Sequence, residues 1–399
     1  MMRLTLLGLL LATLAAPANC AEPQELVLLD GQRAVGRPTQ LKDGALTFAT
    51  AAGEEQSFAA GQWFRWGHPT KPDARPALYF GEQSVLVSKT DWTGKVPMTI
   101  DDRTVTIATS AFGKVNLPRD KVRCLLLAAA KEPGSAARLL DQAATDSSDD
   151  RVWLVEGDLL AGTVVDFDGT TLHLEFSGQT LPVLASTIAA VAFAGDETPA
   201  NLDAKYLVGL DDGSLIEAAG CTLTTEQLSV ESLGEWTSQS PKKLVFLQSL
   251  AGGVQYLSDL DAVDFRHTPY FSGEWPLARD RSLQGSPLQV AGERYAKGLA
   301  MHSAARAVYR VPAGMTTFAA DIALDDSAGQ SGSVVFRIYR VSADGAEQAF
   351  ESEVVRSGDA PQPVQVPLDD AAAIVLVVDY ADYGDQQDHA NWLDARFVP

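Results

Sequence analysis

The sequence predicts an all-β protein, with several small repeated units followed by a larger C-terminal β-sandwich. Apolar and polar residues alternate along short segments such as 172–176, which is the period of a half-buried strand. Asp-Gly and Ser-Gly pairs separate many of these segments, and both pairs favour tight hairpin turns. From residue 299 onward, about eight such segments follow within about 130 residues, a pattern typical of a two-sheet jelly roll.

The region before this sandwich repeats a weak pattern of strand, acidic-Gly turn, further strands, polar loop and final strand. Four units are predicted, over residues 26–66, 77–127, 152–193 and 207–246. Their short, regularly spaced strands resemble small SH3-like or Sm-like barrels. The segment 131–150 interrupts the pattern, because 136–140 favours a short helix and 145–150 has nothing apolar to bury.

The N-terminus is typical of a secretory signal peptide. Arg3 supplies a positive charge, residues 4–15 are mostly apolar, and small residues at 16–21 offer cleavage sites. The protein is therefore expected to be exported, to the periplasm, the cell surface or the medium. No later apolar run reaches about 18 residues, so no membrane insertion is expected. After cleavage only Cys124 and Cys221 remain, and a disulfide and two buried thiols are both open.

These observations predict five segments along the chain. Residues 1–21 are the signal peptide, and 22–131 hold β-repeat units one and two. Residues 132–150 form a linker with a short helix, 151–265 hold units three and four, and 266–399 form the C-terminal β-sandwich.

The charge and the motifs exclude several classes of function. The chain of 399 residues carries a formal net charge of -21, which argues against nucleic-acid binding and against an anionic membrane surface. It contains no Gly-x-Ser-x-Gly elbow, no His-Glu-x-x-His motif and no phosphate loop. With 52 acidic residues, the paired carboxylates that glycoside hydrolysis needs arise by chance and identify nothing. The sequence thus predicts a protein that is not an enzyme.

The C-terminal third carries matches to one family, in the right order. The matching segments are 275–276, 279–282, 295–299, 302–303, 324–326, 332–336 and 388–395. On these residues the region resembles the NPCBM-type carbohydrate-binding module, which is attached to family 98 glycoside hydrolases and is common in exported proteins of planctomycete-like bacteria. The resemblance implies a discoidin-like jelly roll that binds a glycan, galactose-type or another polysaccharide, in some members with a structural calcium. Residues 342–347 depart from the family by loosening its usual tight turn after the central strand.

A sugar site needs an aromatic face for the apolar side of the ring and a few fixed polar groups for the hydroxyls. One C-terminal segment supplies both, and a second histidine lies at a loop-to-strand junction. The predicted sugar-binding residues are His302, Asp388, His389, Asn391 and Trp392. The alternative is that Trp392 plugs the end of the sandwich, Asp388 caps a turn and the histidines are structural.

Two acidic loops are candidates for a calcium site. Asp325 and Asp326 precede a Gly-rich loop, and Asp379 and Asp382 belong to a second oxygen-rich loop. Carboxylates and backbone carbonyls are the ligands that calcium prefers. The alternative is a pair of turns whose Asp side chains bond local amides.

Together these features predict an exported, non-catalytic glycan-binding protein whose N-terminal barrels act as spacers or contact a protein partner. One alternative is a structural protein of the envelope whose jelly roll binds a protein. Another is an accessory module of a glycoside hydrolase system.

Overall fold

The computed structural model describes residues 22–399, except 73–75, 82, 91–93, 128–138, 140–141, 143–146, 195–202, 270–272 and 383. The described elements are β-strands and short 3-10 turns, apart from Leu139 and Gln142, which are helical. The predicted all-β fold class is therefore confirmed. The predicted signal peptide and most of the predicted linker lie outside the described residues. Within the described part of the chain, no helix has the length and apolarity to cross a membrane.

Strands β1–β22 form four units. In each unit the first strand pairs with the last strand. Unit 1 contains β1 (Gln24–Leu28), β2 (Arg33–Lys42), β3 (Ala45–Thr50), β4 (Glu55–Phe58) and β5 (Trp63–Gly67). Unit 2 contains β6 (Ala77–Phe80), β7 (Ser84–Val87), β8 (Met98–Ile100), β9 (Thr104–Thr109), β10 (Gly113–Pro118), η1 (Arg119–Lys121) and β11 (Val122–Leu126). Unit 3 contains β12 (Asp150–Leu154), β13 (Leu159–Phe167), β14 (Thr171–Phe176), β15 (Gln179–Leu184), η2 (Ala185–Thr187) and β16 (Ile188–Ala192). Unit 4 contains β17 (Tyr206–Leu210), β18 (Leu215–Ala218), β19 (Gly220–Leu223), β20 (Leu228–Glu231), β21 (Glu235–Ser238), η3 (Pro241–Lys243) and β22 (Leu244–Ser249).

The units share one pairing scheme. In unit 1, β1 pairs with β2 and with β5, and β3 and β4 continue from β2. Unit 3 repeats this scheme with β12–β16. In units 2 and 4 the second strand is divided in two, into β7 and β8 and into β18 and β19. Alternate apolar residues of all four units point into one continuous core, as the strand period requires.

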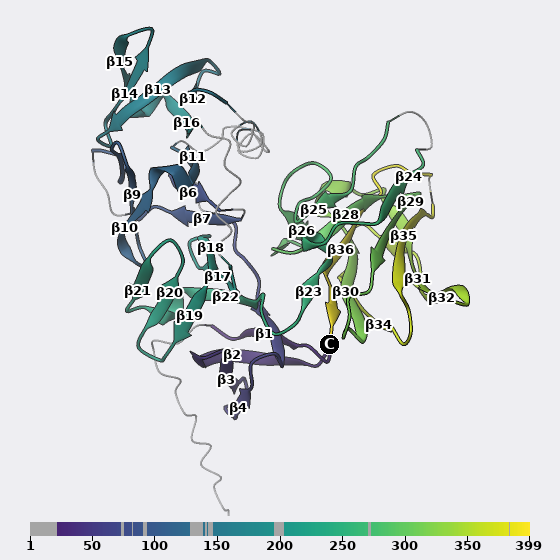
Figure 1. Ribbon diagram of the computed structural model, residues 1–399. Coiled ribbons are helices and arrows are strands. Elements are labelled where there is room, and N and C mark those ends of the chain that lie inside the picture. Colours follow the sequence, from purple (N-terminus) through teal and green to yellow (C-terminus); the bar gives the residue numbers. More distant parts are fainter. Residues whose placement is uncertain are drawn as a thin grey trace, which may run out of the picture.

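The four units lie in the spatial order 1, 4, 2, 3, which differs from their order along the chain (Figure 1). Units 1 and 4 join through β5–β22 and β2–β19, and units 3 and 2 join in the same way through β16–β11 and β13–β8. The two halves meet where Val85 of β7 pairs with Leu215 of β18, which occupy equivalent positions in their units. Unit 1 is therefore equivalent to unit 3, and unit 2 is equivalent to unit 4. An approximate two-fold axis relates the two pairs.

Two glycines confirm this equivalence at the level of single residues. A Cβ added at Gly36 would lie 2.2 Å from the carbonyl oxygen of Ala49, and one added at Gly162 would lie 2.4 Å from that of Glu175. In each unit the second strand also bulges at the same place, two to three residues further along. The close approach of the second and third strands thus requires glycine at this position in both units.

The C-terminal part is a sandwich of two antiparallel sheets (Figure 1). The first sheet contains β25 (Ala278–Arg279), β28 (Gly298–His302), β36 (His389–Val398), β30 (Thr317–Leu324), β34 (Gln362–Pro367) and β23 (Gln255–Tyr256). The second contains β24 (Asp264–His267), β29 (Ala305–Arg310), β35 (Ala373–Tyr380), β31 (Ser333–Ser342), β32 (Gly345–Glu351) and β33 (Val355–Arg356). The hairpin β26 (Leu288–Val290) and β27 (Glu293–Tyr295) lies outside both, and η4 (Leu257–Asp259) and η5 (Asp326–Ala328) are short turns. Because β23 and β24 already pair within these sheets, the sandwich begins before the predicted boundary at residue 266.

A buried polar network joins this sandwich to units 1 and 4. The Nε atom of Arg65 lies 3.0 Å from Oδ2 of Asp394, and Gln248 donates a hydrogen bond to the same carboxylate. The guanidinium of Arg396 lies over the ring of Phe64. The segment 63–66 contributes to both the core and this junction: its two tryptophans enter the core of the units, whereas Phe64 and Arg65 face the sandwich.

Candidate functional site

Two histidines come together at the ends of the central strands of the sandwich. His302 ends β28 and His389 begins β36, and the two residues are direct partners in the antiparallel register. Their ring centroids lie 6.0 Å apart. Antiparallel partners point to the same face of a sheet, so the pairing alone places both imidazoles on one side.

Trp275 and His267 complete an aromatic cluster with this pair. The indole of Trp275 lies parallel to the imidazole of His302, with ring centroids 5.1 Å apart and an interplanar angle of 2°. His267, the last residue of β24, lies 5.5 Å from His302, and the backbone N–H of Trp275 donates to its Nδ1. Trp275 and His267 are partly exposed, whereas His302 and His389 are buried beneath them. The cluster is thus open on the side of Trp275.

A layer of polar atoms lies next to His302. Oδ1 of Asp388 accepts a hydrogen bond from the backbone N–H of Ser333. Oδ2 of Asp388, Oγ of Ser303 and Nδ1 of His302 are enclosed and have no hydrogen bond of good geometry in the described part of the chain. The Ser303 hydroxyl is nevertheless close enough to the Asp388 carboxyl to lower its pKa, so these two groups interact with each other. Buried polar atoms are paired in the great majority of proteins, so this concentration of spare hydrogen-bonding capacity marks the place as a candidate for binding a polar ligand.

The environment determines which of these groups are charged. Burial, followed by the nearby His389 and His267, lowers the pKa of His302 to about 4. Burial also lowers the pKa of His389 and raises that of Asp388 to about 6. At neutral pH the site therefore presents uncharged imidazoles, each with one donor and one acceptor, beside the Asp388 carboxylate, and Asp385 adds a second negative charge nearby.

The structure corrects two of the predicted sugar contacts. Trp392 is fully buried in the core of the sandwich, 4.9 Å from the ring of Phe336 and 6.2 Å from that of Phe318. Asn391 is also enclosed, and its amide donates to Oδ2 of Asp325. Neither side chain can reach a ligand, because both belong to the interior of β36 rather than to a loop. His302, His389 and Asp388 do come together, and their role in binding stays a prediction.

The four predicted calcium ligands do not form a common site. Asp325 caps the turn η5 by accepting from Ser327, and Asp326 accepts from the backbone of Ala291 and Gly292. The other two carboxylates pair with arginines, Asp379 with Arg337 and Asp382 with Arg356. No group of three or more His, Cys, Asp or Glu residues in the described ranges could hold a metal ion. Asp325 and Asp326 thus fit the alternative of turns whose Asp side chains bond local amides, whereas Asp379 and Asp382 form ion pairs instead.

The sequence analysis did not assign Trp275 and His267 to the site. A signal is present in the sequence, because aromatic and histidine side chains crowd residues 266–276. Only the pairing of β24 and β29 brings this segment to the end of β28.

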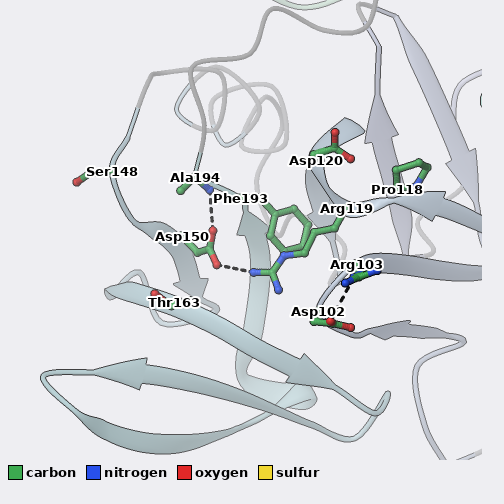
Figure 2. Close-up of a pocket in the computed structure, with 10 residues that line it drawn as sticks. All are labelled: Asp102, Arg103, Pro118, Arg119, Asp120, Ser148, Asp150, Thr163, Phe193 and Ala194. Atoms are coloured by element: carbon green, nitrogen blue, oxygen red, sulfur yellow. Dashed lines mark hydrogen bonds and ion pairs between the residues drawn. The ribbon is translucent and has the colours of Figure 1, made fainter.

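A separate cavity of about 610 Å³ lies between units 2 and 3 (Figure 2). Arg119 stacks on the ring of Phe193 and forms an ion pair with Asp150 at 2.7 Å. Asp150 also accepts hydrogen bonds from the backbone of Ala194 and Val164. Arg119 and Asp150 therefore already have partners within the protein. Their interactions join units 2 and 3 and leave neither group available to a ligand. Cys124 and Cys221 are likewise structural, since both are buried free thiols.

A family model identifies the sandwich. Residues 253–398 match the NPCBM/NEW2 domain. The C-terminal sandwich is an NPCBM/NEW2 domain. This confirms the family that the sequence resemblance implied and the position of the domain in the C-terminal third. The NPCBM/NEW2 domain is a type of carbohydrate-binding module related to the accessory modules of glycoside hydrolases.

Two curated relatives are named as glycosidases. A protein of Renibacterium salmoninarum that is named as an endo-alpha-N-acetylgalactosaminidase is 26% identical over 229 residues, which is 56% of this chain and 14% of that protein. The alpha-1,3-galactosidase B of Akkermansia muciniphila is 30% identical over 119 residues, which is 29% of this chain and 14% of that protein. The matches thus span a small part of either relative.

Solved structures with some similarity come from Clostridium perfringens. The CBM51-2 and INT domains of ZmpB in complex with GlcNAc are 27% identical, with a TM-score of 0.33, over 49% of this chain and 40% of that one. The CBM51 of a GH95 protein in complex with methyl-galactose is 23% identical, with a TM-score of 0.33, over 36% of this chain and 99% of that one.

Proposed function

We propose that the protein is an exported, non-catalytic glycan-binding protein whose NPCBM/NEW2 domain holds a sugar ring against Trp275. One observation supports this most directly: a partly exposed indole lies parallel to His302, whose enclosed Nδ1 has no hydrogen bond of good geometry in the described part of the chain. A pyranose has an apolar face that stacks on an aromatic ring and hydroxyls that need fixed partners at its edge.

The chemistry of the neighbouring groups fits a neutral sugar better than an anion. The lowered pKa values of His302 and His389 leave both imidazoles uncharged at neutral pH, and Asp388 adds a carboxylate that would repel an acidic ligand. A neutral imidazole can donate to one hydroxyl and accept from another, and a carboxylate accepts from hydroxyls. The site therefore favours polyhydroxylated, uncharged ligands.

Binding of the full chain to a glycan array, followed by calorimetric titration with GlcNAc and methyl-galactose, tests the proposal. Trp275→Ala is expected to abolish stacking and to weaken binding at least tenfold. The matched control is Tyr339→Ala, which removes an aromatic residue from β31 whose hydroxyl bonds Gln348 away from the cluster. Unchanged glycan binding by Trp275→Ala would remove this cluster from the site, and the absence of any glycan bound by the wild-type chain would refute the function.

A role beside glycoside hydrolases is a second candidate, which the names of the two relatives favour. In that case the chain directs another protein's active site to the glycan and performs no hydrolysis of its own. The purified full chain is incubated with the glycans it binds, and released sugars are measured. Any hydrolysis that survives repurification would contradict the non-catalytic assignment.

Export is tested by fractionating cells and determining the N-terminus of the mature protein by mass spectrometry.

A further inference from the structure

Large apolar side chains that face solvent are concentrated in unit 3. Its strands β13–β15 carry most of the strongly exposed ones in the described part of the chain, with exposed fractions from 41% to 57%. They are Leu159, Val165, Phe176, Leu181 and Leu184. These residues do not all share one face: Phe176 and Leu181 lie on one side of the hairpin, and Leu184 lies on the other. Contiguous exposed apolar surface, as at Phe176 and Leu181, marks a contact site more often than scattered single residues do.

The internal duplication supplies a control for this surface, because unit 1 has the same fold and the same strand registers. At the equivalent positions unit 1 has small or polar residues. In the order given above, these are Arg33, Thr39, Thr50, Gln56 and Ala59. Unit 1 therefore folds without large apolar residues at these five places, so folding does not explain them in unit 3.

Phe176 and Leu181 form the centre of the surface. Leu181 pairs with Leu174 across the hairpin, and Phe176 is two residues along β14 from Leu174, so all three side chains share one face. Leu174 is buried, whereas Phe176 and Leu181 extend the same apolar row beyond the core, to the tip of the hairpin. This tip lies at the end of the array of units away from the NPCBM/NEW2 domain (Figure 1).

The charge distribution determines which partner fits. The chain carries a net charge of -21, yet residues 176–195 contain no charged side chain at all. An uncharged surface has no preference for a partner of opposite charge. Two copies of a strongly acidic chain can, however, meet there with less repulsion than through a charged surface, and the exposed Glu175 beside Phe176 points to the opposite face of β14. Pro182 lacks an N–H group on the edge strand β15, which favours contact through side chains over addition of a further strand.

We propose that the β14–β15 hairpin is the surface through which two copies of this chain associate, with Phe176 and Leu181 of one copy packed against those of the other. A two-fold arrangement is the commonest form of such self-contact, since one surface then serves both copies. The contact is small by the standard of stable dimers, so it is weak and depends on concentration. The pair carries two NPCBM/NEW2 domains at its outer ends.

Sedimentation velocity of the full chain over a range of concentrations tests this. The wild-type chain is expected to shift from one chain mass toward twice that mass as its concentration rises. Raising the salt concentration should strengthen the association, because salt screens the repulsion between the two acidic copies while leaving the apolar contact intact. A contact made by ion pairs would show the opposite response.

The decisive variant is Phe176→Thr/Leu181→Gln, which installs the residues that unit 1 has at these positions. It is expected to remain a monomer at every concentration, with a melting temperature like that of the wild type. The matched control is Val35→Thr, which removes an equally exposed apolar side chain from unit 1 and should dimerise normally. In addition, Gln179→Cys is expected to form a disulfide between copies under mild oxidation, because residue 179 pairs with Phe176 on the same face and the chain's own described cysteines are buried.

Two outcomes overturn the proposal. One is a wild-type chain that stays monomeric at all concentrations and salt levels, which would assign the surface to a different protein. The other is a double variant that dimerises as strongly as the wild type. If the double variant melts at a lower temperature, the Gln179→Cys crosslink decides, because residue 179 shares the face of Phe176 and Leu181 and the absence of a crosslink refutes contact through that face.

Discussion

Removal of the Arg65 side chain is expected to destabilise the junction between the NPCBM/NEW2 domain and units 1 and 4. The side chains of Arg65 and Asp394 are 3% and 1% exposed, so water cannot replace either partner when the other is removed. The N–H at Nε does not point at the carboxylate, so this contact is ionic rather than a hydrogen bond. In Arg65→Ala, Asp394 keeps the hydrogen bond from Gln248 but loses its nearest cation.

The expected loss is about 3–5 kcal/mol, the range for removing one member of a buried ion pair. Arg33→Ala is the matched control. Arg33 also reaches across the junction, to Asp321, but its side chain is 36% exposed. A pair of this kind contributes about 0–1 kcal/mol, so the same type of substitution should have a small effect there.

Urea unfolding of the full chain, followed by tryptophan fluorescence, measures both variants. We expect the wild-type chain to unfold in one main transition, and Arg65→Ala to show an earlier loss of the junction. Limited proteolysis around residues 249–255, between β22 and β23, gives an independent readout, since opening of the junction exposes this connection. A loss for Arg65→Ala no larger than that for Arg33→Ala would refute the reasoning that burial makes this pair important.

Three further predictions concern the NPCBM/NEW2 domain. Trp392→Ala should destabilise the domain by about 3–5 kcal/mol in urea unfolding, because it empties the core beside Phe318 and Phe336; a stable variant that had lost only glycan binding would restore Trp392 to the site. The pKa of His302 is lowered from the ordinary value of 6.5 to about 4 in the folded chain. Between pH 6.5 and about pH 4, the unfolded chain therefore binds a proton at this residue and the folded chain does not. The free energy of unfolding falls as the pH decreases through this range. His302→Gln should therefore gain stability relative to the wild type on going from pH 7 to pH 4.5, and an identical pH profile for the two proteins would contradict this; the raised pKa of Asp388, which has the opposite sign, is common to both. Finally, calcium and a calcium chelator should leave the melting temperature unchanged, because the four candidate carboxylates already bind amides and arginines; a clear calcium-dependent shift would show that a site exists elsewhere.

Part of the site could be predicted from residue types and spacing. His302 is predicted from its place at a junction between a loop and a strand, and His389 from its place in the polar and aromatic C-terminal segment; strand pairing then makes them neighbours. Trp392 could not be placed in this way. All ten residues of β36 are buried, so the usual alternation that separates an inner from an outer face is absent along it. Trp275 was missed because its place depends on a contact between segments that are distant along the chain.

The sequence by itself determined the all-β class, the existence of repeated units and the family of the C-terminal domain. These follow from local patterns, namely alternation, turn residues and ordered motifs, which do not depend on how the segments meet. Only the tertiary structure decided the order of the units in space, the burial of Arg65 against Asp394 and the assembly of Trp275 with the histidines. Each of these depends on contacts between segments that are distant along the chain. Strands with similar apolar patterns can pair in many ways, and only the packing of the complete core favours one arrangement.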